Sequence, residues 1–520
     1  MVMEKRDLIL SVDVGTTGLR IGVVRADLSI ITVAVQSYPT RFAQPGHAEQ
    51  DPDEWWLAFR AALTELFGKM PDLPKRAAGL VISAQLCGVV PVDTEGQALR
   101  PCLIWLDKRS SKVTRAAMGG FPSILGYGAH KLLTSLWLTN GAPSLNGMDP
   151  PGKMIWLREN EPEIWGRTHK LLDVKDWFIH KATGRFVTTA DSANLTWMMD
   201  TRPRRLAWSP YLMKRFGIAP HMLPDIVAGD QSPGGLTALA AADLGLPAGL
   251  PVIAGCGDVC AAALGSGQVG DGELHLSIGT SSWIGGFYPS RRLKASEGYA
   301  TILSPINNRP LLIATQESAG SCLDWYDSLA SGAAQTRLFR ADPNAAPPPL
   351  FLPWLAGERV PADDERLRGG FLGLSLMHDS RSLAQGVIEG VALNTRWAYR
   401  SVRQQKGTAA GRRLRVVGGV TQNHAFCQTL ANCLATELSI APEARLSGVQ
   451  GAAAIAGAHL GFFPNPWEAA RSLGEKEAAV YRPDPRAASY FDRRFDLFVD
   501  AYRRNAPWFR TFYNSEGERG

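Results

Sequence analysis

The 520-residue chain lacks the features that identify several large classes of protein. Its seven cysteines are an odd number without dense spacing, which argues against a disulfide framework and for a reducing compartment. The pairs Cys256/Cys260 and Cys427/Cys433 have no CxxC partners of the kind that a zinc site needs, so buried free thiols are the better interpretation. No apolar run approaches 18 residues, and the charged N-terminus does not resemble a signal peptide. We therefore expect a soluble, cytoplasmic protein that does not bind a membrane.

The common nucleotide-binding motifs are also missing. No GxxxxGK[ST] sequence occurs, which excludes a P-loop nucleotidase. The segment Gly265 to Gly270 fits GxGxxG, but it follows an expected helix and precedes an expected strand, the reverse of a dinucleotide-binding fingerprint. The formal net charge of +6 is carried by scattered basic residues, which indicates solvated surface charge and no nucleic-acid site.

What the chain does contain is a long-range repeat. The segments VDVGTTGLR and LSIGTSSWIGG each place a Gly-Thr-Thr/Ser turn between strand-like apolar runs, and the turns begin 264 residues apart, at Gly15 and Gly279. This period is too long for a solenoid repeat and indicates a duplicated α/β domain. A hairpin of this composition offers backbone N–H groups and hydroxyls without side-chain bulk, which suits a phosphate. Two such hairpins predict a nucleotide-using enzyme.

The surroundings of the first turn suggest its chemistry. Asp13 stands at the end of a strand expected from Leu8 to Val14, where it could hold Mg²⁺ through water, because Mg²⁺ keeps much of its hydration shell. Arg20 could add a fixed positive charge. Further along, Gln50-Asp51-Pro52 reads as a helix start with Asp51 as the N-cap.

The second half is expected to begin near Gly255, which divides the chain into residues 1–254 and 255–520. Just after this boundary, Asp258 follows a Gly-Cys-Gly turn and precedes a short helix of small residues. An isolated Asp in this position is most often an N-cap, but the small turn residues leave its carboxylate open to a ligand. A helix N-terminus favours negative charge, so we expect a lowered pKa for Asp258 and a weak base.

Taken together, these passages resemble the FGGY family of carbohydrate kinases, within the actin-like ATPase superfamily, and especially its xylulokinase branch. The resemblance extends over nearly the whole chain and rests on VDVGTTGLRIG, EQDPDEWW, LRPCLIWLDKRS, GCGDVCAAALGSG, LSIGTSSWIGG, SCLDW, FLPWLAGERVP and VVGGVTQNHAFCQTLAN. It implies an α/β fold of two ribonuclease-H-like domains with a central cleft for ATP and sugar. It also implies ATP and Mg²⁺ as cofactors, and the habit of the family suggests a homodimer.

The resemblance assigns roles to individual residues. Asp258 matches the catalytic base that accepts the proton of the sugar hydroxyl. The first phosphate site matches Asp13, Thr16, Thr17 and Arg20, with Asp13 nearest the metal. The second phosphate site matches Gly279 and Thr280, and the adenosine site matches Gly418, Gly419, Val420 and Asn423. The sugar pocket matches Gln85, Leu86, Cys87, Asp107 and Lys153.

The sequence also departs from the family pattern at the acceptor. Leu86-Cys87 stands where xylulokinases tend to have Met-His, and Val259 stands where Asn or Gln usually contacts the sugar. Since polar pairing to a hydroxyl discriminates better than shape alone, the acceptor stays open between xylulose and another substrate such as ribulose, glycerol, another polyol or gluconate. A slow ATPase of the actin-like superfamily that does not act on sugars is the alternative from another class.

Overall fold

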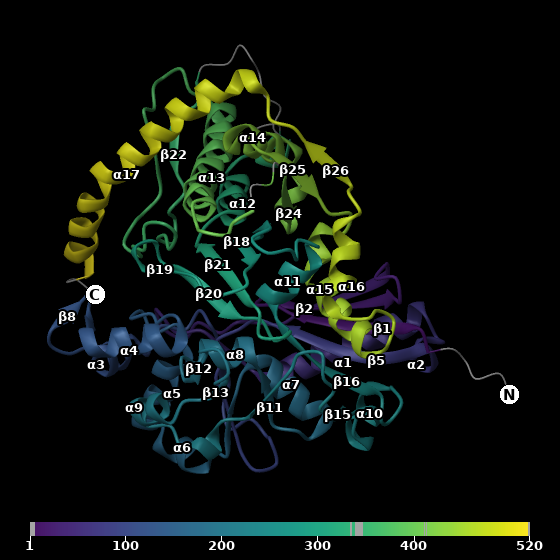
Figure 1. Ribbon diagram of the computed structural model, residues 1–520. Coiled ribbons are helices and arrows are strands. Elements are labelled where there is room, and N and C mark those ends of the chain that lie inside the picture. The colour runs from purple at the N-terminus through teal and green to yellow at the C-terminus, as the bar shows by residue number, and fades with distance from the viewer. Residues whose placement is uncertain (1–5, 333–334, 339–346, 410, 412, 518–520) are drawn as a thin grey trace. The chain divides into compact units, whose positions relative to one another are not determined.

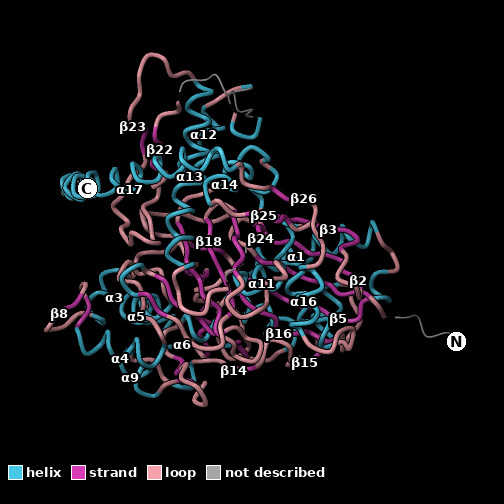
Figure 2. The backbone as a smooth tube through the Cα atoms, turned by 45° about the horizontal axis from the view of Figure 1, so that its top comes forward, coloured by secondary structure: helices cyan, strands magenta, loops and turns pink. Residues whose placement is uncertain are grey.

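The computed structural model describes residues 6–332, 335–338, 347–409, 411 and 413–517, with side chains as far as residue 512. It has mixed α/β architecture with two large sheets, whose strands appear in magenta in Figure 2. The chain forms two compact units: one of residues up to Gly267 with Thr301–Leu311 and Gly448–Leu473, the other of Gln268–Ala300, Leu312–Ser447 and the segment from Gly474 onward.

The sheet of the first unit has six strands in the order β15-β16-β5-β1-β2-β3. Their bounds are β1 (Leu8–Val14), β2 (Gly18–Arg25), β3 (Ile30–Ser37), β5 (Ala77–Ala84), β15 (Gly234–Gly235) and β16 (Pro251–Gly257). Every residue of β5 is buried, as expected of a parallel strand covered on both faces. Helix α1 (Pro52–Lys69) packs on β2 and β3, and α7 (Val174–Thr183) packs on β5 and β16.

Helix α1 begins where the sequence predicts. The side chain of Asp51 accepts a hydrogen bond from the backbone N–H of Asp53, and Pro52 occupies the first helical position. Trp55 and Phe59 are fully buried on its inner face, where Trp55 stacks on Phe178 of α7. The predicted helix start is therefore confirmed.

The second large sheet has the order β19-β20-β21-β18-β17-β24-β25-β26. Its strands are β17 (Leu274–Ile278), β18 (Ser282–Phe287), β19 (Leu293–Lys294), β20 (Tyr299–Leu303), β21 (Pro310–Gln316), β24 (Arg413–Val417), β25 (Glu437–Ile440) and β26 (Ala479–Tyr481). The helices of the second unit include α12 (Gly320–Leu329), α13 (Ser380–Arg403), α14 (His424–Leu434) and α17 (Ala488–Gly517), all labelled in Figure 1. Helix α13 packs along α14, and both contribute to one continuous apolar core.

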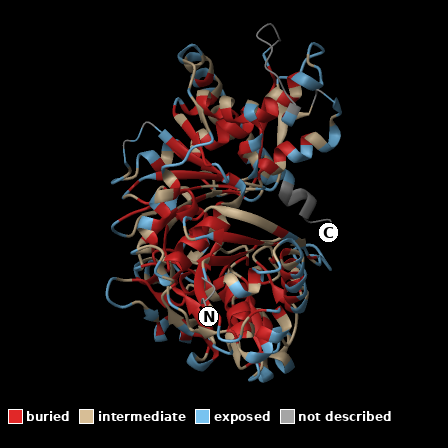
Figure 3. Ribbon diagram, turned by 90° about the vertical axis from the view of Figure 1, so that its right-hand side faces the viewer, coloured by how far each residue is buried: buried red, intermediate tan, exposed pale blue. Residues whose placement is uncertain are grey.

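The two sheets repeat one pattern of strand pairing. In the first, β1 pairs antiparallel with β2 and parallel with β5, which pairs parallel with β16. In the second, β17 pairs antiparallel with β18 and parallel with β24, which pairs parallel with β25. The two Gly-Thr turns therefore close equivalent hairpins, as the sequence repeat predicts. Most strands of both sheets are coloured as buried in Figure 3.

The first unit also contains a second apolar cluster, rich in methionine, which includes Met118, Met154 and Met213, and a set of further helices. These helices are α2 (Leu73–Arg76), α3 (Ser111–Met118), α4 (Ala129–Thr139), α5 (Pro150–Asn160), α6 (Pro162–Arg167), α8 (Ala190–Leu195), α9 (Pro210–Phe216), α10 (Ala238–Leu244), α11 (Asp258–Gly265), α15 (Ser447–His459) and α16 (Pro466–Gly474). Short strand pairs complete the fold: β4 (Glu49–Gln50) with β7 (Cys102–Leu103), β6 (Val90–Val92) with β10 (Lys170–Leu172), β8 (Ser123–Ile124) with β9 (Tyr127–Gly128), β11 (Val187–Thr189) with β14 (Asp225–Val227), β12 (Met199–Asp200) with β13 (Ala207–Trp208), and β22 (Leu350–Leu352) with β23 (Gly370–Leu372).

The observed division of the chain differs from the expected boundary between residues 254 and 255. That boundary cuts through β16, whose pairing with β5 keeps Pro251–Gly257 and the following α11 in the first unit. Cys256, Cys260, Cys427 and Cys433 are buried free thiols, as predicted. In the part of the chain that the structure describes, no helix combines the length and the apolar composition of a membrane span.

Candidate active site

The first Gly-Thr hairpin joins β1 to β2. The N–H of Gly15 donates to the carbonyl of Gly18 at 3.0 Å and closes the turn. A Cβ atom added to Gly18 would lie 2.4 Å from the carbonyl oxygen of Gln36 on β3, so only glycine fits at this position. The hydroxyl of Tyr38 donates to the carbonyl of Gly15 from outside the turn. The backbone of the turn is therefore held by β3 and by Tyr38, which directly follows β3.

Asp13 and Arg20 face each other across this hairpin. They are register partners, and Arg20 Nη1 lies 3.3 Å from Asp13 Oδ2, while the hydroxyl of Ser83 donates to Asp13 Oδ1 at 3.3 Å. Burial raises the pKa of Asp13 above its usual value, and Arg20 and Ser83 oppose that effect. A buried carboxylate with weak protein partners is suited to a divalent cation. Among the described residues, no three His, Cys, Asp or Glu side chains are grouped as a metal cluster.

Thr16 and Thr17 differ in their surroundings. The Thr16 hydroxyl accepts a hydrogen bond from Trp105 Nε1 at 2.9 Å and donates to Gln85 Oε1 at 3.3 Å. Thr17 is exposed at the tip of the turn. The hairpin therefore offers Thr17 to a ligand, while Thr16 connects it to the loop after β5.

The loop after β5 holds the predicted sugar contacts Gln85, Leu86 and Cys87. The N–H of Gln85 donates to the carbonyl of Val14 at 2.8 Å, which extends the pairing of β5 with β1 into the loop. Leu86 packs against the turn before Asp258: a Cβ atom added to Gly257 would lie 2.5 Å from three atoms of Leu86. Cys87 is half-buried and has a positive φ of 66°, unusual for a residue other than glycine. The loop is thus held in one defined, locally strained conformation.

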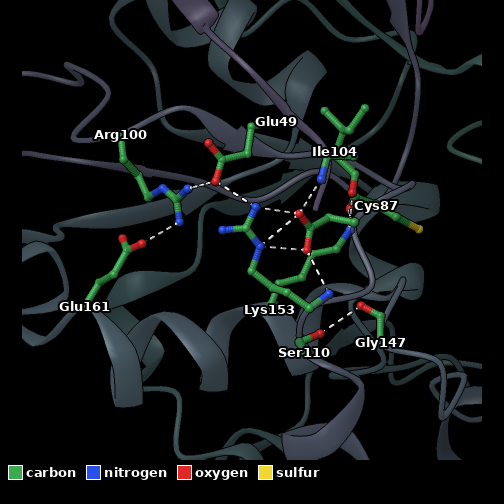
Figure 4. Close-up of polar contacts among 11 residues, drawn as sticks. Glu49, Cys87, Arg100, Ile104, Ser110, Gly147, Lys153 and Glu161 are labelled. Carbon is green, nitrogen blue, oxygen red and sulfur yellow. Dashed lines mark hydrogen bonds and ion pairs between the residues drawn. The ribbon is translucent and has the colours of Figure 1, made fainter. Parts of the chain in front are cut away.

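Two other predicted sugar contacts lie in a supporting layer. Lys153 on α5 is fully buried, and its ammonium donates to the carbonyls of Cys87 and Ile104 at 2.8 and 2.7 Å (Figure 4). Asp107 is also fully buried; its carboxylate accepts from the N–H of Ala48 at 2.7 Å and pairs with Arg109 at 2.8 Å. Both polar groups are already occupied by protein atoms, unlike the direct ligand contacts that the resemblance implies.

Ion pairs surround this layer. Arg109 also contacts Glu49 at 2.7 Å, and Arg100 bridges Glu49 and Glu161, with its nitrogen 3.0 Å from Glu161 (Figure 4). The side chains of Arg100 and Arg109 are at most 9 % exposed, so water screens these pairs only weakly. These ion pairs fix the segment from Arg100 to Arg109 beneath the loop of Gln85, Leu86 and Cys87, which we call the acceptor loop.

Asp258 opens α11, which begins directly at the end of β16. Gly257 is the N-cap and Asp258 is the first helical residue, so the expectation that Asp258 itself is the cap is wrong by one position. Its carboxylate accepts from the N–H of Val259 at 2.8 Å. Burial, followed by the negative charge of Asp13, raises the pKa of Asp258 to about 7. The expectation of a lowered pKa is therefore wrong, because burial and like charge outweigh the helix N-terminus.

Two acids outside the predicted site residues hold the backbone on either side of this site. Asp191, on α8, accepts from the N–H of Gly257 at 2.6 Å and is fully buried. Asp173, the N-cap of α7, accepts from the N–H of Gly88 at 2.8 Å. In the sequence, Asp173 is marked by the charged cluster Asp173-Val174-Lys175-Asp176 within an apolar stretch, whereas no comparable pattern marks Asp191.

The second Gly-Thr hairpin joins β17 to β18 in the other unit. The N–H of Gly279 donates to the carbonyl of Ser281 at 2.9 Å. The start of α12 holds the hairpin from behind: the N–H of Gly320 donates to the carbonyl of Gly279 at 3.0 Å, and those of Ala319 and Ser321 donate to Thr280 at 3.1 and 3.0 Å. Because its carbonyls are bound to α12, the turn keeps a fixed shape, as a phosphate grip requires.

The predicted adenosine residues follow β24. Gly418 has a φ of 102°, and a Cβ atom there would lie 2.2 Å from the carbonyl oxygen of Ile278, so this position requires glycine. Gly419 is exposed with nothing within 4 Å of an added Cβ, and Val420 is half-buried beside it. Asn423 caps α14: its Oδ1 accepts from Phe426 N at 3.0 Å and its Nδ2 donates to the carbonyl of Thr336 at 3.1 Å. The exposed backbone of Gly419 therefore lies between Gly418, where only glycine fits, and Asn423, whose side chain is held by two hydrogen bonds.

Comparison with known proteins gives one consistent family. The model of the FGGY family of carbohydrate kinases, N-terminal domain, matches residues 8–265, and that of the C-terminal domain matches residues 274–460. A xylulose kinase of Lactococcus lactis is 25% identical over 517 residues, covering 98% of this chain and 99% of its own, and an erythritol kinase of Brucella abortus is 28% identical over 537 residues, covering 97% of each.

A solved structure agrees with these matches. The crystal structure of a xylulose kinase from Brucella ovis superimposes with a TM-score of 0.83 at 25% identity, covering 96% of this chain and all of the other. The repeated sheets, the paired glycine hairpins and the family models thus lead to one conclusion. The chain belongs to the FGGY family of carbohydrate kinases and is an ATP-dependent sugar kinase.

Proposed function

We propose that this kinase transfers the γ-phosphoryl group of ATP to a hydroxyl of a ketose such as D-xylulose, with Asp258 as the base. The observation that carries this proposal is the placement of Asp258. It begins α11 beside Leu86 of the acceptor loop, and its pKa of about 7 suits a group that must accept a proton near neutral pH. Asp258 takes the hydroxyl proton, the hydroxyl oxygen forms the new bond to the γ-phosphorus, and ADP leaves with the electrons of the broken P–O bond.

The first hairpin supports the transferred group. We assign the phosphate contacts to the N–H groups of the turn, to Thr16, to the exposed Thr17 and to Arg20. Asp13 is the residue that would hold Mg²⁺, and the bound ion would neutralise charge on the phosphate oxygens. The weak partners of Asp13 support this role, because Arg20 and Ser83 are each 3.3 Å away and leave its oxygens available.

The second unit supplies residues for the nucleotide. We assign Gly279 and Thr280 to the remaining phosphates and Gly418, Gly419, Val420 and Asn423 to adenosine. The exposed backbone of Gly419 supports a grip made by main-chain atoms, which tolerates the change from the family's usual Gly-Gly-Gly-Ala to Gly-Gly-Val-Thr. Asn423 acts there through the backbone that it caps.

The acceptor contacts are assigned to Gln85, Leu86 and Cys87 directly, and to Lys153 and Asp107 through the backbone that they hold. Leu86 and Val259 are apolar, and Cys87 forms weaker hydrogen bonds than the histidine usual in xylulokinases. This set favours a second candidate, an acceptor with fewer hydroxyls to pair, such as a short polyol; the similarity to an erythritol kinase agrees with it. The cytoplasmic location and the homodimer stay predictions from the sequence.

A coupled ADP-release assay tests the proposal. Purified enzyme with MgATP is offered D-xylulose, D-ribulose, erythritol, glycerol and gluconate at equal concentrations. We expect strong stimulation by one acceptor, highest for D-xylulose, and a decrease of about 10²- to 10⁴-fold in kcat for Asp258→Asn, the range typical of a positioned base. ADP release that no acceptor stimulates would indicate the ATPase alternative. Near-normal turnover by a folded Asp258→Asn variant would refute the assignment of the base.

A further inference from the structure

Gln50 occupies the last position of β4, directly before Asp51, the N-cap of α1, and none of its surface is exposed. Its amide forms four hydrogen bonds. The Nε2 group donates to the carbonyl of Thr16 at 2.6 Å and to the hydroxyl of Thr40 at 2.8 Å. The Oε1 atom accepts from Gln85 Nε2 at 2.9 Å and from Trp55 Nε1 at 3.1 Å. Both donors and both lone pairs of this buried amide are therefore used.

Two of these bonds connect parts of the site that the sequence separates. Thr16 belongs to the first phosphate hairpin, and Gln85 belongs to the acceptor loop. These two residues also contact each other, since the Thr16 hydroxyl donates to Gln85 Oε1 at 3.3 Å. Gln50, Gln85 and Thr16 thus form a closed ring of hydrogen bonds in which each residue contacts the other two.

A ring of this kind has few alternative arrangements. If the Gln85 amide rotated to meet a ligand, Gln50 Oε1 would lose a donor and the Thr16 hydroxyl would lose its acceptor. In a buried network, unpaired polar atoms are costly, so the partners move together or not at all. An amide is required at position 50, because a carboxylate lacks the two donors and an apolar side chain lacks both donors and acceptors.

We propose that Gln50 is a positioning residue that couples the acceptor loop to the first phosphate hairpin, so that binding of the sugar at Gln85 orders the carbonyl of Thr16 and its turn for the phosphate. This inference rests on the proposed function for the identity of the two ligands. The Gln50 amide connects Thr16 to Gln85, and its two remaining hydrogen bonds are to Trp55 and Thr40. Gln50 itself does not touch the reacting atoms.

Thermodynamic linkage tests the coupling directly. Isothermal titration calorimetry measures the affinity for D-xylulose, or for the acceptor that the panel selects, with and without Mg²⁺ and the non-hydrolysable analogue β,γ-imido-ATP. The ratio of the two dissociation constants is the coupling factor, which is about 5- to 150-fold in proteins that couple two sites. The same factor must appear when the analogue is titrated with and without sugar.

Three variants separate coupling from stability. Gln50→Met keeps the length of the side chain and removes all four hydrogen bonds; Gln50→Glu keeps the acceptor for Trp55 and Gln85 but loses the donors to Thr16 and Thr40. Trp55→Phe is the matched control, because it removes one bond to Gln50 and leaves a cavity in the core without touching the links to Thr16 and Gln85. Circular dichroism and thermal melting report whether each variant is folded.

We expect a coupling factor near 1 in Gln50→Met and Gln50→Glu, and a wild-type factor in Trp55→Phe even if its Tm falls. A wild-type factor near 1, or an unchanged factor in folded Gln50→Met, overturns the proposal. If Gln50→Met does not fold, Gln50→Glu decides the question by the same criterion. Failure of the proposed function looks different, since the wild-type enzyme would then phosphorylate no acceptor in the panel.

Discussion

Glu358 offers a test in which the sign and the size of a pH effect follow from its surroundings. It lies in the second unit, and only 2 % of its surface is exposed. Its carboxylate accepts from Asn394 Nδ2 at 2.5 Å and from the N–H groups of Glu317 and Arg359 at 3.0 and 2.7 Å. These donors are neutral, and the guanidinium of Arg359 pairs instead with Glu317 at 2.7 Å. Burial therefore prevails and raises the pKa of Glu358 from 4.5 to about 7.

The sign follows from proton linkage. In the unfolded chain, Glu358 ionises near pH 4.5, whereas in the folded chain it ionises near pH 7. Between these values the folded state binds more protons, so the free energy of unfolding falls as the pH rises, and it levels off above pH 7. Integrated from pH 5 to pH 8, the two pKa values give a loss of about 2–3 kcal/mol. Solvent screens the Glu358 carboxylate only weakly, because the side chain is buried.

The perturbation is Glu358→Gln, which cannot ionise. Urea unfolding, followed by tryptophan fluorescence, gives the free energy of unfolding for wild type and Glu358→Gln at pH 5, 6, 7 and 8. If unfolding has more than one transition, the free energy is taken from the transition whose midpoint the substitution shifts. Any constant effect of the substitution cancels when differences between pH values are compared. We expect the stability advantage of wild type over Glu358→Gln to shrink by about 2–3 kcal/mol from pH 5 to pH 8.

Asp379→Asn is the control in the same unit. Asp379 caps α13, and its hydrogen bonds to the backbone and hydroxyl of Ser382 lower its pKa below 3.8, so its ionisation falls outside the pH range of the experiment. Its difference from wild type should stay constant from pH 5 to pH 8. If the Glu358→Gln difference is equally constant, the carboxylate is ionised throughout and the reasoning from burial is wrong.

The other predictions concern the site. Asp191→Ala removes the acceptor of the Gly257 N–H, and we expect a loss of about 1–3 kcal/mol in urea unfolding together with a lower kcat, while an unchanged kcat would show that this bond does not position the base. Gly320→Ala places a Cβ atom 2.2 Å from the carbonyl oxygen of Gly279, and steady-state kinetics should show KM for ATP raised about tenfold or more, equivalent to about 1.4 kcal/mol, with KM for the sugar unchanged. Lys153→Met leaves two carbonyls of the acceptor region without a donor, so Tm should fall and KM for the sugar should rise more than KM for ATP.

The local features of the site were predictable from the sequence because they depend on neighbours in the chain. The Gly-Thr turns need glycine and hydroxyls at fixed positions, and Asp13 and Arg20 meet because a short hairpin pairs residues seven apart. The helix start at Asp51 was equally accessible, since capping involves residues two apart. Local geometry of this kind follows from spacing alone.

Features that depend on packing were not accessible. Gln50 precedes a helix cap in the sequence, and nothing in that pattern shows that its amide contacts Thr16 and Gln85, which are 34 and 35 residues away. The pKa of Asp258 was misjudged for the same reason: the helix N-terminus is visible in the sequence, whereas burial and the charge of Asp13 are visible only in the fold. The boundary at residue 254 was misplaced because the pairing of β16 with β5 is non-local.

The pairing registers of the two sheets show that the loops after β5 and β24 are equivalent, as well as the two Gly-Thr turns. In the first sheet Val14 pairs with Ala84, after which the acceptor loop begins at Gln85. In the second sheet Ser277 pairs with Val417, after which Gly418 begins the loop assigned to adenosine. By the spacing of the repeat, Asp13 corresponds to Ser277. The two loops therefore begin at almost the same position in their sheets, each after the parallel strand next to the first strand of the Gly-Thr hairpin.

Under the proposed assignments, the two duplicated units bind different ligands at one structural position. A sugar is recognised by its hydroxyls and needs side-chain partners, and the first loop accordingly carries Gln85, whose amide is fixed by Gln50. A nucleotide base and ribose can be gripped by main-chain atoms, and the second loop carries Gly418 and Gly419. The two hairpins are also held differently: the first accepts a hydrogen bond from the Gln50 amide in addition to its contacts with β3 and Tyr38, and the second is bound by the N–H groups at the start of α12. Under the proposed function only the first unit binds the sugar, and Gln50, which would couple sugar binding to the phosphate hairpin, lies in that unit.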